Sequence, residues 1–211
     1  MGLAVGAHWP LPLVQVNLSD NQLCGLYLRY GGIFYGPLQG TYSDVGIKAI
    51  AEALVMASVT SIDLSDNHIR AEGAKALAPA LRDSTSITSV GKDGLNLKHN
   101  YFGDEGWGAI FAAICSSQVS KITSIDASGE EIGPAGAKLI GQALGNSVNP
   151  SLTSINLYDN HLGAEGAKAL APAVRDSPSM TSINLSNNNL TGRNFVKETE
   201  LPGSNLKVGD K

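Results

Sequence analysis

A repeat with a period of 28 residues constrains the fold more than any other feature of this chain. The stretch LTSINLYDNHL at residues 152–162 returns as MTSINLSNNNL at residues 180–190, with the apolar residues in the same places and Asn160 matched by Asn188. A fixed period of this length is typical of proteins that stack one structural unit along an axis. Each unit then contacts only its neighbours. We therefore expect the 211 residues to form one extended array.

Each unit combines a strand pattern with a helix pattern. The LxxLxL part places apolar side chains on one face of a short strand, and the Gly-x-x-x-Leu-x-x-x-Leu part places an apolar stripe along a helix. Neighbouring strands lie about 4.8 Å apart, whereas packed helices need about 8–10 Å. The pattern thus predicts an α/β curved solenoid, with a parallel β-sheet on the concave side and α-helices on the convex side.

The array is expected to fill residues 1–190 with about six units, followed by a polar C-terminal tail at 191–211. Residues 1–12 read as an irregular N-terminal cap, and residues 24–43 as an insertion in the first unit. The third unit carries about five extra residues before residue 95. We predict strands of one parallel sheet at 59–64, 95–97, 125–127, 155–157 and 183–185. Helices are predicted from Asp44 and near 72–82, 104–115, 134–145 and 164–175.

An asparagine follows the strand in most units, at positions 21, 67, 100, 160 and 188. Its amide can donate to and accept from backbone groups of adjacent turns. The fourth unit has Glu130 at this position, and an ionised carboxylate only accepts, so we expect an irregular turn there. Pro79 and Pro172 fall inside predicted helices, where each removes one backbone donor and is expected to kink the helix.

The spacing LxxLxLxxNxL followed by xxxGxxxLxxxL over roughly residues 13–190 resembles the leucine-rich repeat of the ribonuclease-inhibitor type. The Ala-rich AEGAKALAPAL units are similar to large repeat families of protists and algae. The resemblance implies a curved βα solenoid that binds other proteins, mostly inside eukaryotic cells. It implies no defined enzymatic activity.

Charge and hydropathy exclude several classes of partner. The formal net charge is −4, and the 15 lysines and arginines are spread singly, whereas a nucleic-acid surface needs them clustered. No apolar run approaches the roughly 18 residues of a membrane span, and the N-terminal stretch lacks the basic region of a secretory signal. We therefore expect an intracellular protein, cytoplasmic or within an organelle, that is not secreted, binds no nucleic acid and does not span a membrane.

The chain also lacks the usual signatures of chemistry. Cys24 and Cys115 are separated by about three units, which argues against a disulfide and favours a reducing compartment. His68 and His161 occupy equivalent positions in the repeat, so repetition explains them, and no histidine or cysteine pair has metal-ligand spacing. We expect no catalytic residue set, no cofactor and no metal.

Two regions are candidates for binding another protein. The outward strand positions form a small, polar and weakly acidic concave face on which the larger side chains are Lys98 and Tyr158. The insertion holds two alternating runs around Gly31-Gly32, which predict a β-hairpin. Tyrosine suits interfaces because it pairs an apolar ring with a polar tip. Aromatic residues gather in the insertion at Tyr27, Tyr30, Phe34, Tyr35 and Tyr42, and Trp107 stands out in the third unit.

The sequence thus predicts a non-enzymatic protein-interaction or scaffold module, as a possible subunit of a larger assembly. The alternatives are a GTPase regulator or an enzyme inhibitor built from the same repeat. The expected main contact is the insertion, with the concave face as the competing surface. The sixth unit has a strand but no helix. The tail, a partner or further residues are therefore expected to cover its apolar edge at Met180, Ile183, Leu185 and Leu190.

Overall fold

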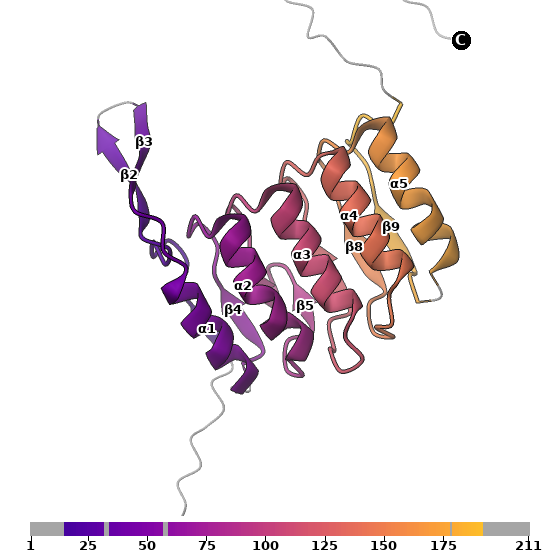
Figure 1. Ribbon diagram of the computed structural model, residues 1–211, viewed down its shortest axis with the longest axis horizontal. Coiled ribbons are helices and arrows are strands. Elements are labelled where there is room, and N and C mark those ends of the chain that lie inside the picture. The colour runs from indigo at the N-terminus through magenta and orange to yellow at the C-terminus, as the bar shows by residue number, and fades with distance from the viewer. Residues whose placement is uncertain (1–14, 32–33, 57–58, 178, 192–211) are drawn as a thin grey trace, which may run out of the picture.

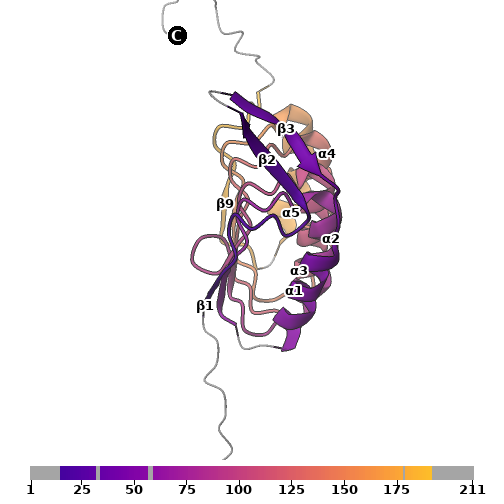
Figure 2. The same ribbon diagram turned by 90° about the vertical axis from the view of Figure 1, so that its left-hand side faces the viewer.

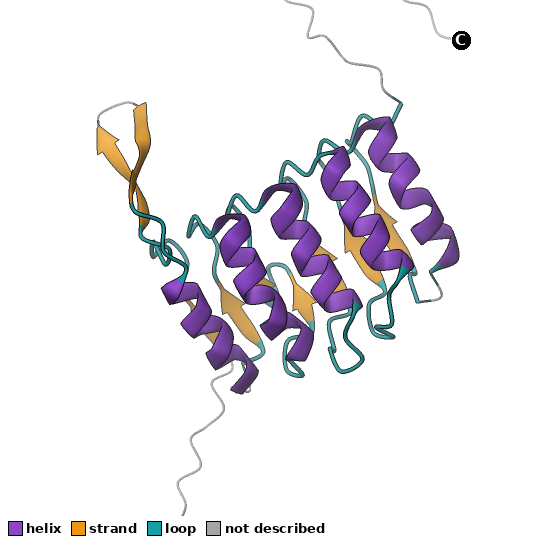
Figure 3. Ribbon diagram, viewed as in Figure 1, coloured by secondary structure: helices purple, strands orange, loops and turns teal. Residues whose placement is uncertain are grey.

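The computed structural model describes residues 15–31, 34–56, 59–177 and 179–191, with the backbone alone between 27 and 38. The predicted N-terminal cap at 1–12 and the tail beyond residue 191 lie outside the described residues. Within these ranges the molecule has two layers, with helices in one and strands in the other (Figures 1 and 3).

The strand layer is a seven-stranded sheet in the described part of the chain, and its neighbouring strands all run parallel. Its order is β1-β4-β6-β5-β7-β8-β9. Equivalent repeat positions stand side by side, since Ile125 pairs with Ile155 and Ile155 with Ile183. The predicted parallel sheet is confirmed. Its strands are β1 (Gln15–Asn17), β4 (Ser61–Asp63), β5 (Ser89–Val90), β6 (Leu95–Asn96), β7 (Ser124–Asp126), β8 (Ser154–Asn156) and β9 (Ser182–Asn184).

The helix layer covers one face of the sheet, as Figure 2 shows from the end of the stack. Consecutive helices pack against each other along the array. Helix α2 continues through Pro79 and helix α5 through Pro172. The predicted helices are confirmed, as α1 (Val45–Met56), α2 (Arg70–Asp83), α3 (Gly103–Cys115), α4 (Pro134–Gly145) and α5 (Gly163–Asp176).

The core lies between the two layers and follows the period-2 alternation of the strands. Ile155 is 1% exposed and Leu157 is fully buried, whereas Ser154 and Asn156 on either side of Ile155 are half-buried. This alternation recurs in β4 and β7. Strand β9 has one neighbour in the sheet, and no described helix follows it. Its apolar residues are accordingly only partly buried, at Met180, Ile183, Leu185 and Leu190.

The third unit departs from the predicted arrangement. One strand was expected at 95–97, but β5 also joins the sheet, with Val90 paired to Leu95. Strand β6 lies beside β4 and β5 beside β7, so their order in the sheet is the reverse of their order in the chain. The connecting loop depends on glycine, because a Cβ atom on Gly94 would lie 2.3 Å from the backbone oxygen of Ser89. The extra residues therefore let one unit contribute two strands.

The insertion contains the predicted hairpin. Strands β2 (Leu26–Gly31) and β3 (Phe34–Gly40) pair antiparallel, with a register shift between Leu28 and Tyr30. The hairpin projects away from the solenoid at its N-terminal end (Figure 1). Its base is anchored by buried Cys24 and Leu26. In the described part of the chain, no helix is long and apolar enough to cross a membrane.

Candidate functional site

Four of the asparagines after the strands form a ladder of buried amides, at Asn67, Asn100, Asn160 and Asn188. Each of these amide nitrogens donates to carbonyl oxygens two and three residues back and to one in the preceding unit. The amide oxygens accept from backbone N–H groups of the preceding turn, with one such bond at Asn188 and two at each of the others. Asn160, which is 3% exposed, shows the full pattern. It donates to Ala127 O (2.9 Å), Leu157 O (3.1 Å) and Tyr158 O (3.3 Å) and accepts from Glu130 N (3.1 Å) and Ile132 N (2.9 Å).

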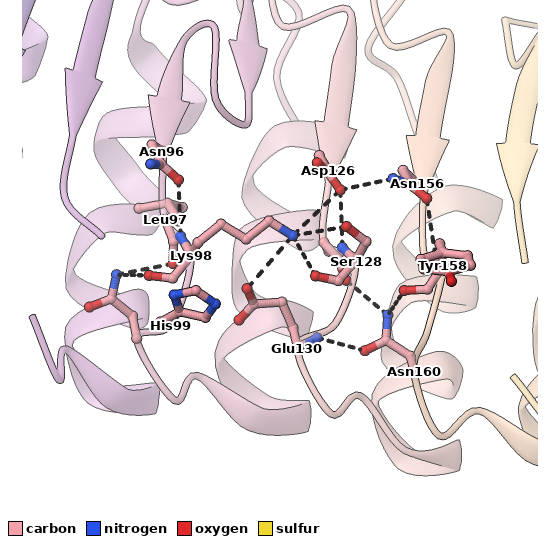
Figure 4. A network of polar contacts seen from close by, with 12 residues as sticks. Asn96, Leu97, Lys98, His99, Asp126, Ser128, Glu130, Asn156, Tyr158 and Asn160 are labelled. Atoms are coloured by element: carbon pink, nitrogen blue, oxygen red, sulfur yellow. Dashed lines mark hydrogen bonds and ion pairs between the residues drawn. The ribbon is translucent and has the colours of Figure 1, made fainter. Parts of the chain in front are cut away.

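Glu130 interrupts this ladder. The irregular turn expected here is not seen, because Gly129 and Glu131 have positive φ angles (67° and 58°), as the residues on either side of Asn67 and Asn100 do. The Glu130 carboxylate cannot donate to the carbonyl oxygen of Ser128, two residues back, which an asparagine amide would satisfy in the other units. The ammonium of Lys98 from the preceding unit donates to that oxygen instead, and to Ser128 Oγ at 2.9 Å (Figure 4). Lys98 Nζ also lies 3.6 Å from Asp126 Oδ1 and 3.9 Å from Glu130 Oε1. Lys98 therefore replaces the missing amide.

Trp107 belongs to the same irregular region. Its side chain is 1% exposed and packs against Phe102 and Phe111, with ring centroids 5.5 and 6.4 Å apart. Its Nε1 has no partner at hydrogen-bonding distance and geometry, although the indole lies close enough to Glu130 to lower the pKa of that carboxyl. Trp107 was predicted to contact a partner, but the ring is a core residue here.

Burial controls the ionisation of Glu130. The residue is 8% exposed, and removal from water raises the pKa of its carboxyl above the ordinary value, because the charged form loses hydration. Lys98, the backbone N–H of His99 and the Trp107 indole offset part of this rise. The folded chain consequently binds the Glu130 proton more tightly than the unfolded chain does.

Replacing Glu130 with asparagine is expected to restore the ladder and to raise the free energy of unfolding by about 1–2 kcal/mol at pH 7. A raised folded-state pKa gives stability that is present at low pH and lost as the pH rises through that pKa. The advantage of Glu130→Asn over the natural chain should therefore grow from pH 4 to pH 7. Urea denaturation across this range measures it, with Glu131→Gln as the exposed control. A less stable Glu130→Asn chain would show that the carboxylate is a net stabilising group.

The other predicted contact residues fall into three environments. The Tyr42 hydroxyl donates to Ile69 O at 2.8 Å, and burial raises its pKa, so Tyr42 anchors the base of the insertion. Tyr158 is 45% exposed, and its backbone N–H donates to Asn156 Oδ1 at 3.0 Å. Tyr27, Tyr30, Phe34 and Tyr35 lie on the hairpin strands, and their side chains are outside the described residues.

Sequence reasoning did not identify the Lys98–Glu130 pair. A signal was present, because Lys98 stands where other units have Ser65, Ser128 and Ser186, and Trp107 stands where they have alanine. Both departures adjoin the unit that lacks the asparagine. In the described part of the chain, no three histidine, cysteine, aspartate or glutamate side chains are placed to hold a metal ion. Cys24 and Cys115 are buried free thiols.

Residues 55–78 and 148–171 match a model described as a leucine-rich repeat. Two parts of this chain are leucine-rich repeats. Both matches span the end of one unit and the following strand and helix, and with the parallel sheet they establish an α/β leucine-rich-repeat solenoid.

Among solved structures, the chain is similar to leiomodin-1 actin-binding site 2, with 18% identity and a TM-score of 0.45. The match covers 54% of this chain and 62% of the leiomodin chain. No curated protein matches the sequence.

Proposed function

We propose that the solenoid, with repeats of the ribonuclease-inhibitor type, is a non-enzymatic scaffold that binds another protein through the β2–β3 hairpin. The observation that carries this proposal is the isolation of the hairpin. Its strands pack against each other and make at most sparse contacts with the other described helices and strands. A two-stranded hairpin is marginally stable in water on its own. A partner that packs against it would supply the missing support.

The backbone of the hairpin offers a specific mode of recognition. Strands β2 and β3 form a two-stranded sheet of their own, so each has one edge without a neighbouring strand in the described part of the chain. Such an edge can pair with an extended segment of another chain. Tyr27, Tyr30, Phe34 and Tyr35 would add aromatic contacts, which are enriched among residues that dominate binding energy.

The outward face of the large sheet is a weaker candidate. Its polar side chains bond to one another, as Asn96 does to Asp63 at 3.1 Å and Asn156 to Asp126 at 3.0 Å. Lys98 is engaged with Ser128, which leaves Tyr158 as the exposed aromatic residue of this face. A GTPase regulator or an enzyme inhibitor would need more polar, acidic or aromatic side chains available for binding on this face. These contacts therefore favour the hairpin as the main interface of a scaffold or assembly subunit.

Deleting residues 27–40 is expected to leave the melting temperature within a few degrees of the natural value and to abolish partner capture. The ends can be rejoined by a short turn because Leu26 pairs with Gly40. Affinity capture from the native source, followed by mass spectrometry, measures the loss. Tyr158→Ser, which introduces the residue found in neighbouring units, is the control that should retain the partner. If the truncated chain captures the same partner, the partner binds the outward face of the sheet and not the hairpin.

A further inference from the structure

The two ends of the solenoid expose surfaces that interior units bury. Strand β1 lies at one edge of the large sheet and β9 at the other, so each has one neighbouring strand in the described part of the chain. Helix α1 packs against α2 and helix α5 against α4, and Figure 1 shows no described helix beyond either. The large apolar residues exposed on α1 are Val45, Val55 and Met56. Both ends therefore offer a repeat boundary that no described element covers.

Helix α5 repeats the face that α2 buries. The two helices differ only at the first and twelfth of their 14 positions. In α2 this face packs against α3, where a Cβ atom on Gly106 would lie 3.0 Å from Ala74 Cβ and 3.1 Å from Ala71 Cα. Ala74 is fully buried, whereas the matching Ala167 and Ala164 of α5 are only partly buried. A helix with a glycine in its first turn would therefore fit against α5.

Helix α1 carries such a glycine on its open side. Gly46 is equivalent to Gly106, because a Cβ atom on either would press on the residue four positions before it in the repeat, at Leu23 and Phe102. The glycine of α5, Gly166, lies against an alanine of the helix before it, as Gly106 does. No described helix precedes α1, so the same contact surface is present there without a partner.

Charge at the ends is also complementary. A groove between α4 and α5 is lined by Gly145 of the first helix and Pro172 of the second. Counted from the glycine of each helix, the same two positions at a boundary between α5 and α1 hold Arg175 and Glu52. Both residues are exposed. An opposite pair at the rim of an interface contributes little affinity, but it favours one orientation of the two surfaces.

The strand edges offer the hydrogen bonds that join interior units. The N–H of Leu157 donates to Asn184 O of the next unit at 2.9 Å. Leu185 holds the position of Leu157 in the last unit, and its N–H donates to no described residue. In the first unit the carbonyl equivalent to Asn184 O is that of Asn17, on the open edge of β1. A donor at one end of the stack thus matches an acceptor at the other.

The first asparagine of the repeat lacks a preceding unit in the same way. Asn21 is exposed, and its amide nitrogen donates to Ser19 O at 2.9 Å and to no preceding turn among the described residues. In the interior, such an amide oxygen accepts from two N–H groups of the preceding turn. The equivalent groups at the other end of the stack are the N–H of Asn188 and of Leu190. The carbonyl that the amide would bond there is that of Leu185.

We propose that these two ends bind each other in different copies of the chain, so that β9 and α5 of one copy dock against β1 and α1 of the next. The sheet then continues in parallel, with Ile183 opposite Val16, as Ile155 stands opposite Ile183 within the chain. The contact continues the interface that already joins the units, and it covers apolar ends that repeat arrays have to protect. It joins unlike surfaces, so copies add in a row. It goes beyond the proposed function and does not involve β2 or β3.

Sedimentation velocity of the full chain over a wide range of concentration tests this inference. The mass should rise with concentration to more than two chains. Ala167→Arg should block the α5 end and Ala49→Arg the α1 end, because Ala49 is exposed and matches Ala169, which lines the groove between α4 and α5. Each variant alone should lose self-association. Ala112→Arg, at an exposed position of α3 inside the stack, is the control that should associate like the natural chain.

An equimolar mixture of Ala167→Arg and Ala49→Arg should form a complex of two chains, since each variant keeps the end that the other has lost. This recovery also shows that both variants fold. A natural chain that stays monomeric at every concentration would overturn the inference, and association that returns on deletion of residues 192–211 would then identify the tail as the occupant of the α5 end. Self-association of Ala49→Arg alone, or a mixture that stays monomeric, would also contradict the head-to-tail contact. The hairpin-deleted chain should associate normally, so failure here leaves the capture result unaffected.

Discussion

Replacing Leu157 with alanine is expected to lower the free energy of unfolding by about 2–5 kcal/mol. Leu157 is fully buried between the sheet and the helices, so truncation removes apolar contacts and leaves a cavity. The rigid stacking of units on both sides limits how far the core can collapse into that cavity. Urea denaturation followed by circular dichroism measures the loss.

Ser154→Ala is the matched control for this change. Ser154 lies on the outward face of the same strand, half-buried, and its replacement should change stability by no more than about 0.5 kcal/mol. Comparable losses at Leu157 and Ser154 would mean that the inward and outward faces of β8 are assigned the wrong way round.

Replacing Asn160 with alanine is expected to lower the free energy of unfolding by about 3–5 kcal/mol. The amide of Asn160 donates to three carbonyl oxygens and accepts from two backbone N–H groups. Alanine can replace none of these bonds, and water cannot reach groups that the neighbouring units cover. The affected backbone belongs to Glu130 and Ile132, so the loss should disturb the fourth unit as well as the fifth.

Asn156→Ala provides the comparison for the ladder. Asn156 also makes two side-chain hydrogen bonds, but it lies on the outward face, where water can replace them. Its loss should cost less than about 1 kcal/mol. Hydrogen exchange of the fourth-unit amides gives a second measure, because only Asn160→Ala should accelerate it. Equal effects of the two substitutions would contradict the special role of the buried ladder.

Much of the fold follows from the 28-residue period. Alternation around Ile155 and Ile183 predicts the inward strand faces, and the four-residue spacing of glycine and leucine predicts the helices. The Gly31-Gly32 pair between two alternating runs predicts the hairpin, because a tight antiparallel turn needs such residues. These signals are local, so one sequence carries them without an alignment.

The exchanged order of β5 and β6 could not be predicted in the same way. A few extra residues between Val90 and Leu95 are compatible with a surface loop or with a second strand, and the cost of closing either loop is nearly equal. The choice depends on close backbone approach at Gly94, which has no periodic signature. The spacing of residues in the sequence does not predict such backbone contacts.

The candidate site was only partly predictable for a related reason. The absence of the ladder asparagine at Glu130 was evident, and an irregular turn was expected. Lys98 compensates for the missing amide by reaching across to Ser128 of the next unit, 30 positions along the chain. Side-chain reach of this kind depends on the stacking geometry. Trp107 was assigned to a surface because its size is unusual in the repeat, but the same size fills the core beside Phe102 and Phe111.

Hydrogen–deuterium exchange of the chain, alone and in its captured complex, distinguishes the hairpin from the outward sheet face as the contact surface. The isolated hairpin should exchange rapidly, because a two-stranded sheet with few other contacts opens easily. Binding through the hairpin should slow exchange across β2 and β3 and leave the outward positions of β7, β8 and β9 unchanged. Protection confined to those strands, with β2 and β3 still exchanging rapidly in the complex, would contradict the proposed interface.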